Sequence, residues 1–426
     1  MNNKSFLNGK FNIDLSWNII SFGLIAIIGL LINVVIVKFL NYEALGVFNQ
    51  VLAFYLILSQ LSSFGIHLSI QRYIPELQNK EEQKSSLMGA LILLIGVSLL
   101  FLGLSFLFFT YIPLFSNEIR TSVIIAIPGV FLFSINKLLL SYLIGIRSMK
   151  AYSIFNALRY FLMLLFLGCL IMLSWDIVLL LVISELFLTF ALLVYLYKEF
   201  KGLNKSDLSK WMKKHFHFGR KSFWGNLLLD ANTKVDVIVL GLFVSTELVG
   251  VYSFAALFYE GFSQFLVVIR NNINPIITNA YFNSGKQIMN RVISKSIKKT
   301  YKFMTPLGLT GVLGYPVVLL VFGESAFFKE SWVIFGILML TNVGFSGLIP
   351  FNTIFNQIGQ PLKQTLFFGV YFGINLILNL LLIPIIGVFG AAIALFTASA
   401  LCNVYLVRFI FYSKFEGDGK QNNVIK

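Results

Sequence analysis

The sequence predicts an all-α integral membrane protein with twelve transmembrane helices. Three observations predict this class: an excess of apolar residues, an uneven distribution of lysine and arginine between alternate loops, and a weak internal repeat. Of the 426 residues, 58% are hydrophobic and only 12% are charged, whereas about 25% of the residues of a soluble domain are charged. Because one membrane-spanning helix takes about 20 apolar residues, this composition suffices for about twelve spans. It excludes a cytosolic enzyme and a secreted domain.

Apolar runs separated by polar breaks mark the expected helices. The first six are residues 15–38, 46–71, 85–109, 123–146, 154–173 and 177–197, and the second six are 222–243, 249–269, 303–321, 332–355, 365–383 and 389–411. The first run is too long for a removable signal peptide, so we expect it to span the membrane. The loops expected outside the cytoplasm are short, which leaves no room there for a catalytic domain.

Lysine and arginine residues concentrate on one side of the predicted membrane. Of the 33, 26 fall in the N-terminal segment, in every second loop or in the C-terminal tail, 3 fall in the opposite loops, and 4 lie within expected spans. Cytoplasmic loops carry an excess of these residues, so we expect both termini in the cytoplasm. The net charge of +15 then reflects topology and contact with anionic lipid, and no nucleic-acid partner is expected.

The largest basic loop divides the chain into two sets of six spans. The expected organisation is an N-terminal lobe at 1–197, a basic cytoplasmic linker at 198–221, a C-terminal lobe at 222–411 and a cytoplasmic tail at 412–426. Two basic segments, 203–216 and 286–302, also carry apolar residues at helical spacing. This pattern is typical of helices that lie in the lipid headgroup layer.

The two halves share a weak repeat with an offset of 204 residues. Glu43–Phe48 follows the first helix, and the similar stretch Glu247–Tyr252 follows the seventh. The same offset relates Gln60 to Gln264 and Tyr111 to Tyr315. Six spans in each half give both halves the same orientation, so the repeat is parallel. Parallel repeats are typical of transporters whose substrate site lies near the membrane midplane.

Several stretches resemble a known family, the polysaccharide or O-antigen flippases of the multidrug/oligosaccharidyl-lipid/polysaccharide exporter superfamily. Residues 230–254, DANTKVDVIVLGLFVSTELVGVYSF, look like the signature of the seventh and eighth helices of that family. Similar matches are Glu43–Phe48, Phe64-Gly65 with Arg72, Gly145–Tyr160, Asn274-Pro275 and Asn379–Ala392. Their order and spacing across about 400 residues carry the resemblance more than any single motif does.

The resemblance implies two six-helix lobes around a central cavity. It also implies a substrate, undecaprenyl-diphosphate-linked oligosaccharide, that moves from the inner to the outer leaflet of the bacterial inner membrane by alternating access. Such transport supplies O-antigen, lipopolysaccharide, capsule or exopolysaccharide synthesis, with polymerase and chain-length proteins as partners. A multidrug exporter driven by protons or sodium is the alternative function. A membrane-embedded polymerase is less favoured, because it needs a large extracytoplasmic loop or an attached catalytic domain.

Six charged residues lie near the middle of expected spans: Lys137, Glu185, Asp230, Lys234, Asp236 and Glu260. On insertion scales each costs roughly 2.5–3.5 kcal/mol at the membrane centre, so we expect them to be paired, neutralised or facing water. Their charges sum to −2 when all are ionised, although a diphosphate site favours positive charge. Some of the acids are therefore candidates for protonation and for coupling to a proton or sodium gradient.

The expected helix 222–243 carries three of these charges. Asp230 and Lys234 are four residues apart on one face, and two interpretations stay open. They form an internal ion pair, or Lys234 lines the cavity and binds a phosphate. Asp236 lies on another face of the same helix.

The other central charges allow two interpretations each. Lys137 either pairs with Glu185 or serves as a cavity cation. Arg159, near the cytoplasmic end of its span, either reaches the membrane surface or meets the diphosphate. Glu185 and Glu260 have no cation within one helical turn, so they are either coupling acids or protonated, hydrogen-bonded side chains.

The candidate substrate-binding cations are therefore Lys137, Lys234 and Arg159, and the candidate coupling or ion-pair acids are Glu185, Asp230, Asp236 and Glu260. No cofactor is expected, and no Cys/His cluster has the spacing of a metal site. The two cysteines, Cys169 and Cys402, lie far apart in apolar runs and predict no disulfide.

Overall fold

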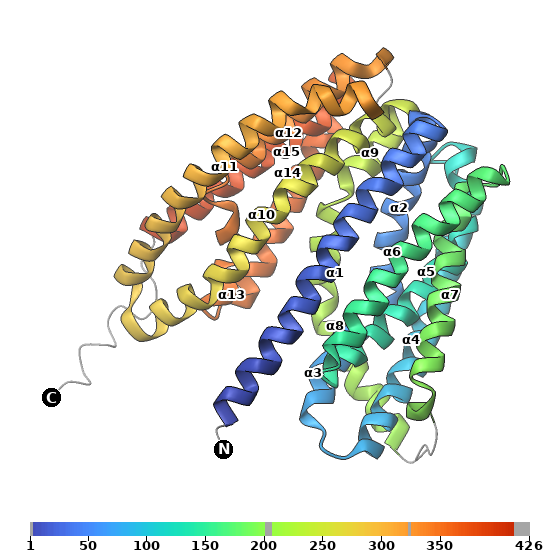
Figure 1. Cartoon of the computed structure of the whole chain (residues 1–426), viewed down its shortest axis with the longest axis vertical. Coiled ribbons are helices and arrows are strands. Elements are labelled where there is room, and N and C mark those ends of the chain that lie inside the picture. The colour runs from blue at the N-terminus through green and yellow to red at the C-terminus, as the bar shows by residue number, and fades with distance from the viewer. Residues whose placement is uncertain (1–2, 201–206, 323–324, 413–426) are drawn as a thin grey trace. The chain divides into compact units, whose positions relative to one another are not determined.

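The computed structural model describes residues 3–200, 207–322 and 325–412, and this part of the chain contains helices and no strand (Figure 1). The helices are α1 Asn3–Phe39, α2 Tyr42–Ser63, α3 Ile66–Tyr73, α4 Lys80–Tyr111, α5 Asn117–Gly145, α6 Met149–Met172, α7 Leu180–Tyr195, α8 Leu208–Asn232, α9 Val235–Phe243, α10 Thr246–Ser284, α11 Lys286–Phe322, α12 Phe328–Gly344, α13 Ile354–Gln357, α14 Pro361–Ile386 and α15 Val388–Val407. Short 3₁₀ turns cover Ile74–Glu76, Ile177–Leu179, Tyr197–Phe200, Ser325–Phe327 and Ile349–Phe351, and a π turn covers Arg408–Tyr412.

Within the described residues, ten helical segments are long and apolar enough to cross a membrane. The chain is therefore a multi-pass, all-α membrane protein, and helical structure covers each of the twelve expected spans. Three of these spans are interrupted. Residues 46–71 break between α2 and α3 at Phe64-Gly65. Residues 222–243 break between α8 and α9 at Thr233–Lys234, and residues 332–355 break after α12, which ends at Gly344.

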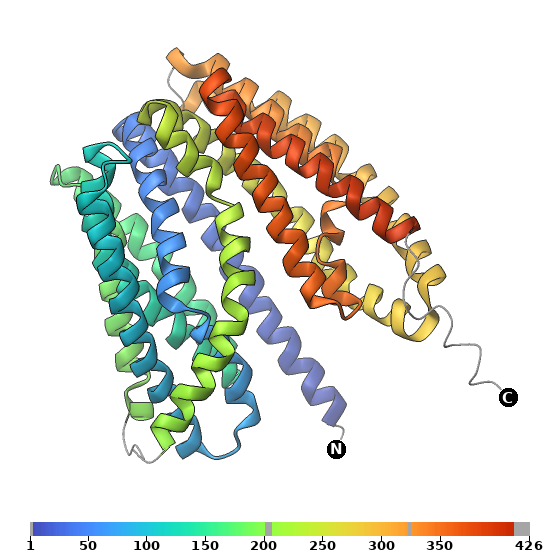
Figure 2. The ribbon, with the colours of Figure 1, turned by 180° about the vertical axis from the view of Figure 1, so that it is seen from behind.

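The helices form two compact units, Met1–Ala231 and Asn232–Lys426. In the first unit α1 packs on α6, while α2, α4 and α7 pack on α5. In the second unit α10 packs on α11 and α12, and α14 and α15 run side by side (Figure 2). The division between the units falls at residues 231 and 232, and the lobe, linker and tail bounds expected from the sequence stay predictions.

The Phe64-Gly65 pair is a sharp turn between α2 and α3. Both residues have left-handed backbone conformations, with φ of 46° and 71°, which glycine adopts without steric cost. A Cβ on Gly65 would lie 2.5 Å from Ser222 Oγ, and a Cβ on Gly219 would lie 2.6 Å from the Phe64 carbonyl oxygen. Gly65 is therefore needed both for the left-handed conformation of the turn and for its close contact with α8, and Gly219 is needed for that contact.

The N-terminal half of α8 packs against other helices of the first unit. Trp211 is 3% exposed and fits against Gly89 of α4, where an added Cβ would lie 3.0 Å from the Trp211 Cβ. Trp211 therefore packs on protein, whereas Phe216 is exposed. The expectation that segment 203–216 lies in the headgroup layer stays a prediction, and residues 201–206 lie outside the described part. A pattern of apolar residues among basic ones does not distinguish a lipid partner from a protein partner.

Segment 286–302 is the first half of the long helix α11. Met289 and Ile293 are fully buried in the core of the second unit, beside Phe351 and Ile354. Segment 286–302 is continuous with the expected span 303–321. Its apolar face packs on protein.

His215 fixes α8 to two other helices of the first unit. Its Nδ1 lies 2.5 Å from Ser69 Oγ of α3, and its Nε2 lies 3.1 Å from Ser86 Oγ of α4. The ring is fully buried. The pKa of His215 is lowered to about 4, chiefly by burial; a hydrogen bond with the Ser86 backbone opposes this shift and the nearby Lys214 ammonium adds to it. The imidazole is therefore neutral at pH 7.

The repeat seen in the sequence corresponds to equivalent helix starts. Asn41 is the N-cap of α2 and Ser245 is the N-cap of α10, and the offset between them is again 204. Their side chains accept hydrogen bonds from the backbone N–H groups of Ala44 and Leu248, at 2.8 and 3.4 Å. The two halves correspond in where their helices start but not in the surroundings of equivalent side chains. Tyr111 is 76% exposed, whereas its counterpart Tyr315 is buried.

Candidate functional site

The second unit contains a cavity of about 360 Å³ where α8 gives way to α9. Residues from α9, α10 and α14 line it together with the residues at the helix break. Three of the predicted site residues, Lys234, Asp236 and Glu260, are among them. A cavity of this size lies at the lower end of the range for small-molecule sites.

The break between α8 and α9 sets the position of Lys234. Asn232 is the last residue of α8, and Lys234 is the N-cap of α9, with φ of −131°. Lys234 and Asp230 are thus not four residues apart on one continuous helix. The Asp230 side chain lies outside the described residues, so its expected pairing with Lys234 stays a prediction.

Lys234 forms an ion pair with Glu260 of α10. Its Nζ donates to Glu260 Oε1 at 2.9 Å. The Lys234 side chain is 21% exposed and the Glu260 side chain 47%, so the pair is partly exposed, and both residues line the cavity. The two residues are 26 positions apart in sequence, and helical spacing cannot reveal such a partner.

Asp236 accepts hydrogen bonds from a tyrosine and from the backbone. Its Oδ2 accepts a hydrogen bond from the Tyr252 hydroxyl of α10, and its Oδ1 accepts one from the Val237 backbone N–H at 2.9 Å. Tyr252 is fully buried. This carboxylate therefore has two donors and is bound to the helix pair α9–α10.

A smaller cavity of about 180 Å³ shares Tyr259, Ser263 and Tyr371 with the first one. Asn342 of α12 donates to the Tyr259 carbonyl oxygen at 3.1 Å and to Ser263 Oγ at 3.0 Å. Tyr371 and Ser399 share a hydrogen bond of 2.8 Å. Sequence reasoning missed these neutral polar groups, because single Tyr, Ser and Asn residues are common in membrane helices. The cavity is polar on several sides.

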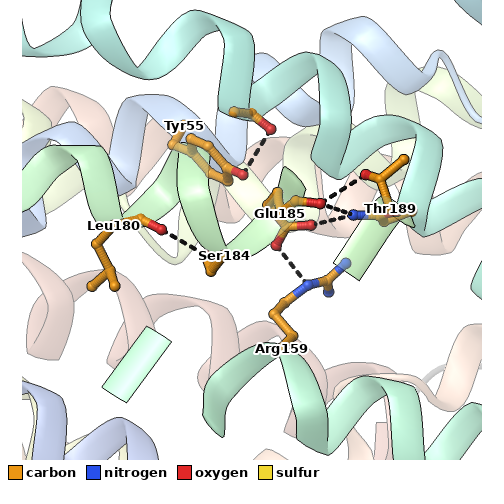
Figure 3. Close-up of polar contacts among 8 residues, drawn as sticks. Tyr55, Arg159, Leu180, Ser184, Glu185 and Thr189 are labelled. Carbon is orange, nitrogen blue, oxygen red and sulfur yellow. Dashed lines mark hydrogen bonds and ion pairs between the residues drawn. The ribbon is translucent and has the colours of Figure 1, made fainter. Parts of the chain in front are cut away.

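The first unit contains a buried ion pair between Arg159 of α6 and Glu185 of α7 (Figure 3). Arg159 Nε lies 2.7 Å from Glu185 Oε1, and the two side chains are 9% and 3% exposed. Asn136 of α5 donates to Glu185 Oε2, also at 2.7 Å. The Arg159 guanidinium lies 4.4 Å from the centre of the Phe133 ring. Three helices thus meet at one carboxylate.

Close packing of α5 on α7 explains why Asn136 reaches Glu185. A Cβ on Gly129 would lie 2.7 Å from the Leu181 carbonyl oxygen, so the two backbones are in contact there. Asn136 lies two turns beyond Gly129, and Glu185 lies one turn beyond Leu181. The Tyr55 hydroxyl of α2 donates to the Gly129 carbonyl oxygen at 2.9 Å (Figure 3).

This arrangement bears on two pairs of alternatives that the sequence leaves open in the first unit. Arg159 does not reach the membrane surface, because it is 8% exposed and pairs inward with Glu185. One of the two interpretations of Lys137 is a pair with Glu185, and in the structure the cation that pairs with Glu185 is Arg159. Lys137 is half-buried on α5 and lies close enough to His67 of α3 to interact with it electrostatically.

The fold is shared with solved membrane transporters. A structure described as the lipid II flippase MurJ in an inward closed conformation superposes with a TM-score of 0.74 at 17% identity, covering 92% of this chain and 86% of that one. An inward-facing multidrug resistance transporter of the MATE family gives 0.69 at 15% identity, covering 91% and 93%. A MOP superfamily transporter from Pyrococcus furiosus gives 0.54 at 15% identity, covering 93% of both chains. The fold is therefore that of the all-α membrane transporters.

The family follows from the sequence itself. Residues 14–282 match the model of a family described as polysaccharide biosynthesis protein. This match covers more than half of the chain, so the protein belongs to that family. No curated protein matches it in sequence.

Proposed function

We propose that this protein is a flippase for lipid-linked oligosaccharides. It moves repeat units attached to undecaprenyl diphosphate from the inner to the outer leaflet of the bacterial cytoplasmic membrane by alternating access. The units serve O-antigen, capsule or exopolysaccharide synthesis, where polymerase and chain-length proteins are the expected partners. Both termini lie in the cytoplasm, and the protein is a transporter and not an enzyme.

Membership of the polysaccharide biosynthesis family is the observation that carries this proposal. The matched residues include α8, α9 and almost all of α10, which supply Lys234 and Glu260 to the cavity of the second unit. A diphosphate is an anion, and Lys234 offers a partly exposed ammonium group at the cavity. The likeness to the lipid II flippase supports the same proposal, because that protein has this fold.

Coupling to a proton or sodium gradient belongs to the same proposal. Ionisable residues inside a membrane protein are costly and typically mark ion or substrate paths. Glu260 is the better coupling candidate because it is partly exposed and lines the cavity, whereas Glu185 is enclosed by Arg159 and Asn136. The proposal needs no cofactor.

A cation-coupled multidrug exporter is the second candidate function. The cavity of the second unit favours it in one respect, because two carboxylates, Asp236 and Glu260, accompany one lysine among its lining residues. The likeness to multidrug resistance transporters adds to this. Family membership favours the oligosaccharide over a drug as the substrate.

Deletion of the gene from its host tests the proposal. We expect lipid-linked repeat units to accumulate with their sugars facing the cytoplasm, and surface polysaccharide to be lost. A plasmid copy should restore both. The Lys234→Ala variant should reach normal abundance in the membrane yet fail to restore export, and Lys234→Arg should restore part of it. Lys295→Ala, which removes an exposed lysine of α11, is the matched control and should act as wild type.

A different result would favour the exporter. Normal surface polysaccharide in the deletion strain, together with increased sensitivity to cationic dyes, would replace the flippase proposal by the exporter.

A further inference from the structure

Two ion pairs that join different helices, Arg159–Glu185 and Lys234–Glu260, differ in how exposed they are. Arg159–Glu185 is enclosed, with exposed fractions of 9% and 3%, a hydrogen bond from Asn136 and a ring contact with Phe133. Lys234–Glu260 has exposed fractions of 21% and 47%. A buried pair that loses one partner leaves an uncompensated charge, whereas a pair open to water contributes little and exchanges partners readily.

Lys234 also lies where a new partner has room to enter. It belongs to the short break between α8 and α9 and lines the cavity of about 360 Å³ together with Glu260. Asp236, the other carboxylate of this cavity, accepts hydrogen bonds from Tyr252 and Val237. Of the two carboxylates, Glu260 is thus the one that occupies the Lys234 ammonium at hydrogen-bonding distance.

A phosphate group is a stronger partner for an ammonium than a single carboxylate is. It offers more acceptor oxygens and more negative charge, and charge-assisted hydrogen bonds to phosphate are among the stronger ones. Separation of the Glu260 carboxylate from the Lys234 ammonium costs little free energy, because the pair is partly exposed. Exchange of the carboxylate for a phosphate is therefore favourable at this place, while it is unfavourable at the enclosed Arg159.

We propose that Glu260 is an internal counter-ion that occupies Lys234 in the resting protein and is displaced by the phosphate of the substrate. This inference rests on the proposed function and specifies its binding step. Lys234 binds the anion, and Glu260 keeps the cation neutralised between transport cycles and competes with the anion at release. Glu260 thereby sets both the affinity for the substrate and the rate at which it leaves.

Binding of farnesyl diphosphate to the purified full-length protein in detergent tests this directly. Glu260→Gln removes the competitor, so binding should strengthen roughly twofold to fivefold, the range expected for a partly exposed ion pair. Lys234→Gln should weaken binding in both backgrounds, and the loss should be larger in the Glu260→Gln background. All of these differences should shrink at high salt, because salt screens exposed charges.

Two controls separate this role from a structural one. Glu247→Gln removes an exposed acid from the first turn of the same helix and should leave binding unchanged. Glu260→Ala repeats the test with a smaller side chain if the Gln variant does not fold. A pair that only holds α9 to α10 would instead lower the melting temperature in Glu260→Gln without strengthening binding.

The outcomes distinguish this inference from the proposed function. Unchanged or weaker binding in Glu260→Gln, or no binding of the probe to the wild type, overturns the counter-ion role even where the gene restores polysaccharide export. Stronger binding in Glu260→Gln, combined with a gene that has no effect on polysaccharide export, keeps the anion site and rejects the flippase.

Discussion

At the residue scale, the charges inside the membrane are arranged by neighbouring helices. Arg159 and Glu185 come from α6 and α7, and Lys234 and Glu260 come from opposite sides of the α9–α10 turn. The cost of placing a charge in the membrane predicts that partners exist. It does not predict which ones, because each pair joins residues that are 26 positions apart in sequence. The sequence thus identifies Glu185, Lys234 and Glu260 as charges that need partners, but it does not identify the partner of Glu185 as Arg159 or the partner of Lys234 as Glu260.

Removing one member of the buried pair should destabilise the first unit. Arg159→Met or Glu185→Gln alone should cost about 3–5 kcal/mol, because the remaining polar group stays buried without its partner. The double variant should recover most of this loss. Thermal unfolding of the purified proteins in detergent gives the comparison. Additive losses in the double variant would show that the two side chains do not act as a pair.

At the element scale, α8 is a connecting helix that is bound to the first unit along its N-terminal half. Trp211, His215 and Gly219 face α3, α4 and the Phe64-Gly65 turn. The basic amphipathic pattern predicted the helix, but not the surface that covers it. The helix break at Thr233–Lys234 was not predicted either, although the polar stretch from Asp230 to Asp236 interrupts the apolar run there.

The stability of the α8 contact should depend on pH through His215. An unfolded histidine has a pKa of about 6.5, whereas the pKa of His215 in the folded protein is about 4. Between these values the unfolded state binds more protons, so stability falls as the pH decreases from about 6.5 to about 4. His215→Gln should lose less stability over this interval, as measured by melting temperature. His217→Gln, an exposed neighbour on α8, should follow the wild type. Equal pH profiles for all three proteins would contradict a buried neutral His215.

The contact of α8 with the turn should not tolerate a side chain at Gly219. A Cβ there would lie 2.6 Å from a backbone oxygen, and overpacking of this kind costs roughly 1–3 kcal/mol. Gly219→Ala should therefore lower the melting temperature. Gly96→Ala on α4, where an added Cβ has no atom within 4 Å, should leave it unchanged or raise it. A lower melting temperature for Gly96→Ala than for Gly219→Ala would mean that α8 does not pack closely on the Phe64-Gly65 turn.

At the scale of the whole molecule, composition and apolar runs were enough to predict an all-α membrane protein with helices at the right places. They succeed because the membrane requires about 20 apolar residues for each crossing, whatever the tertiary contacts. The parallel repeat reappears in the N-caps Asn41 and Ser245. The cavity of the second unit depends on contacts between α9, α10 and α14, which no local pattern encodes.

The predicted orientation is tested by reporter fusions. Fusions at residue 210 and at the C-terminus should report the cytoplasm, and fusions at 117 and 328 should report the outside. The distribution of 26 to 3 lysines and arginines motivates this result. A fusion at 210 that reports the outside would reverse the orientation of both halves.

Transport of a lipid-linked oligosaccharide by the purified protein tests the central claim most directly. The protein would be reconstituted into liposomes with an undecaprenyl-diphosphate oligosaccharide, and sugar exposed on each leaflet would be measured with a membrane-impermeant glycosidase. We predict that the wild type brings sugar from the protected leaflet to the enzyme within minutes, and that Lys234→Ala does not. Liposomes in which the wild type leaves the protected sugar untouched, yet moves a cationic dye under an imposed proton or sodium gradient, would contradict the flippase and favour the exporter.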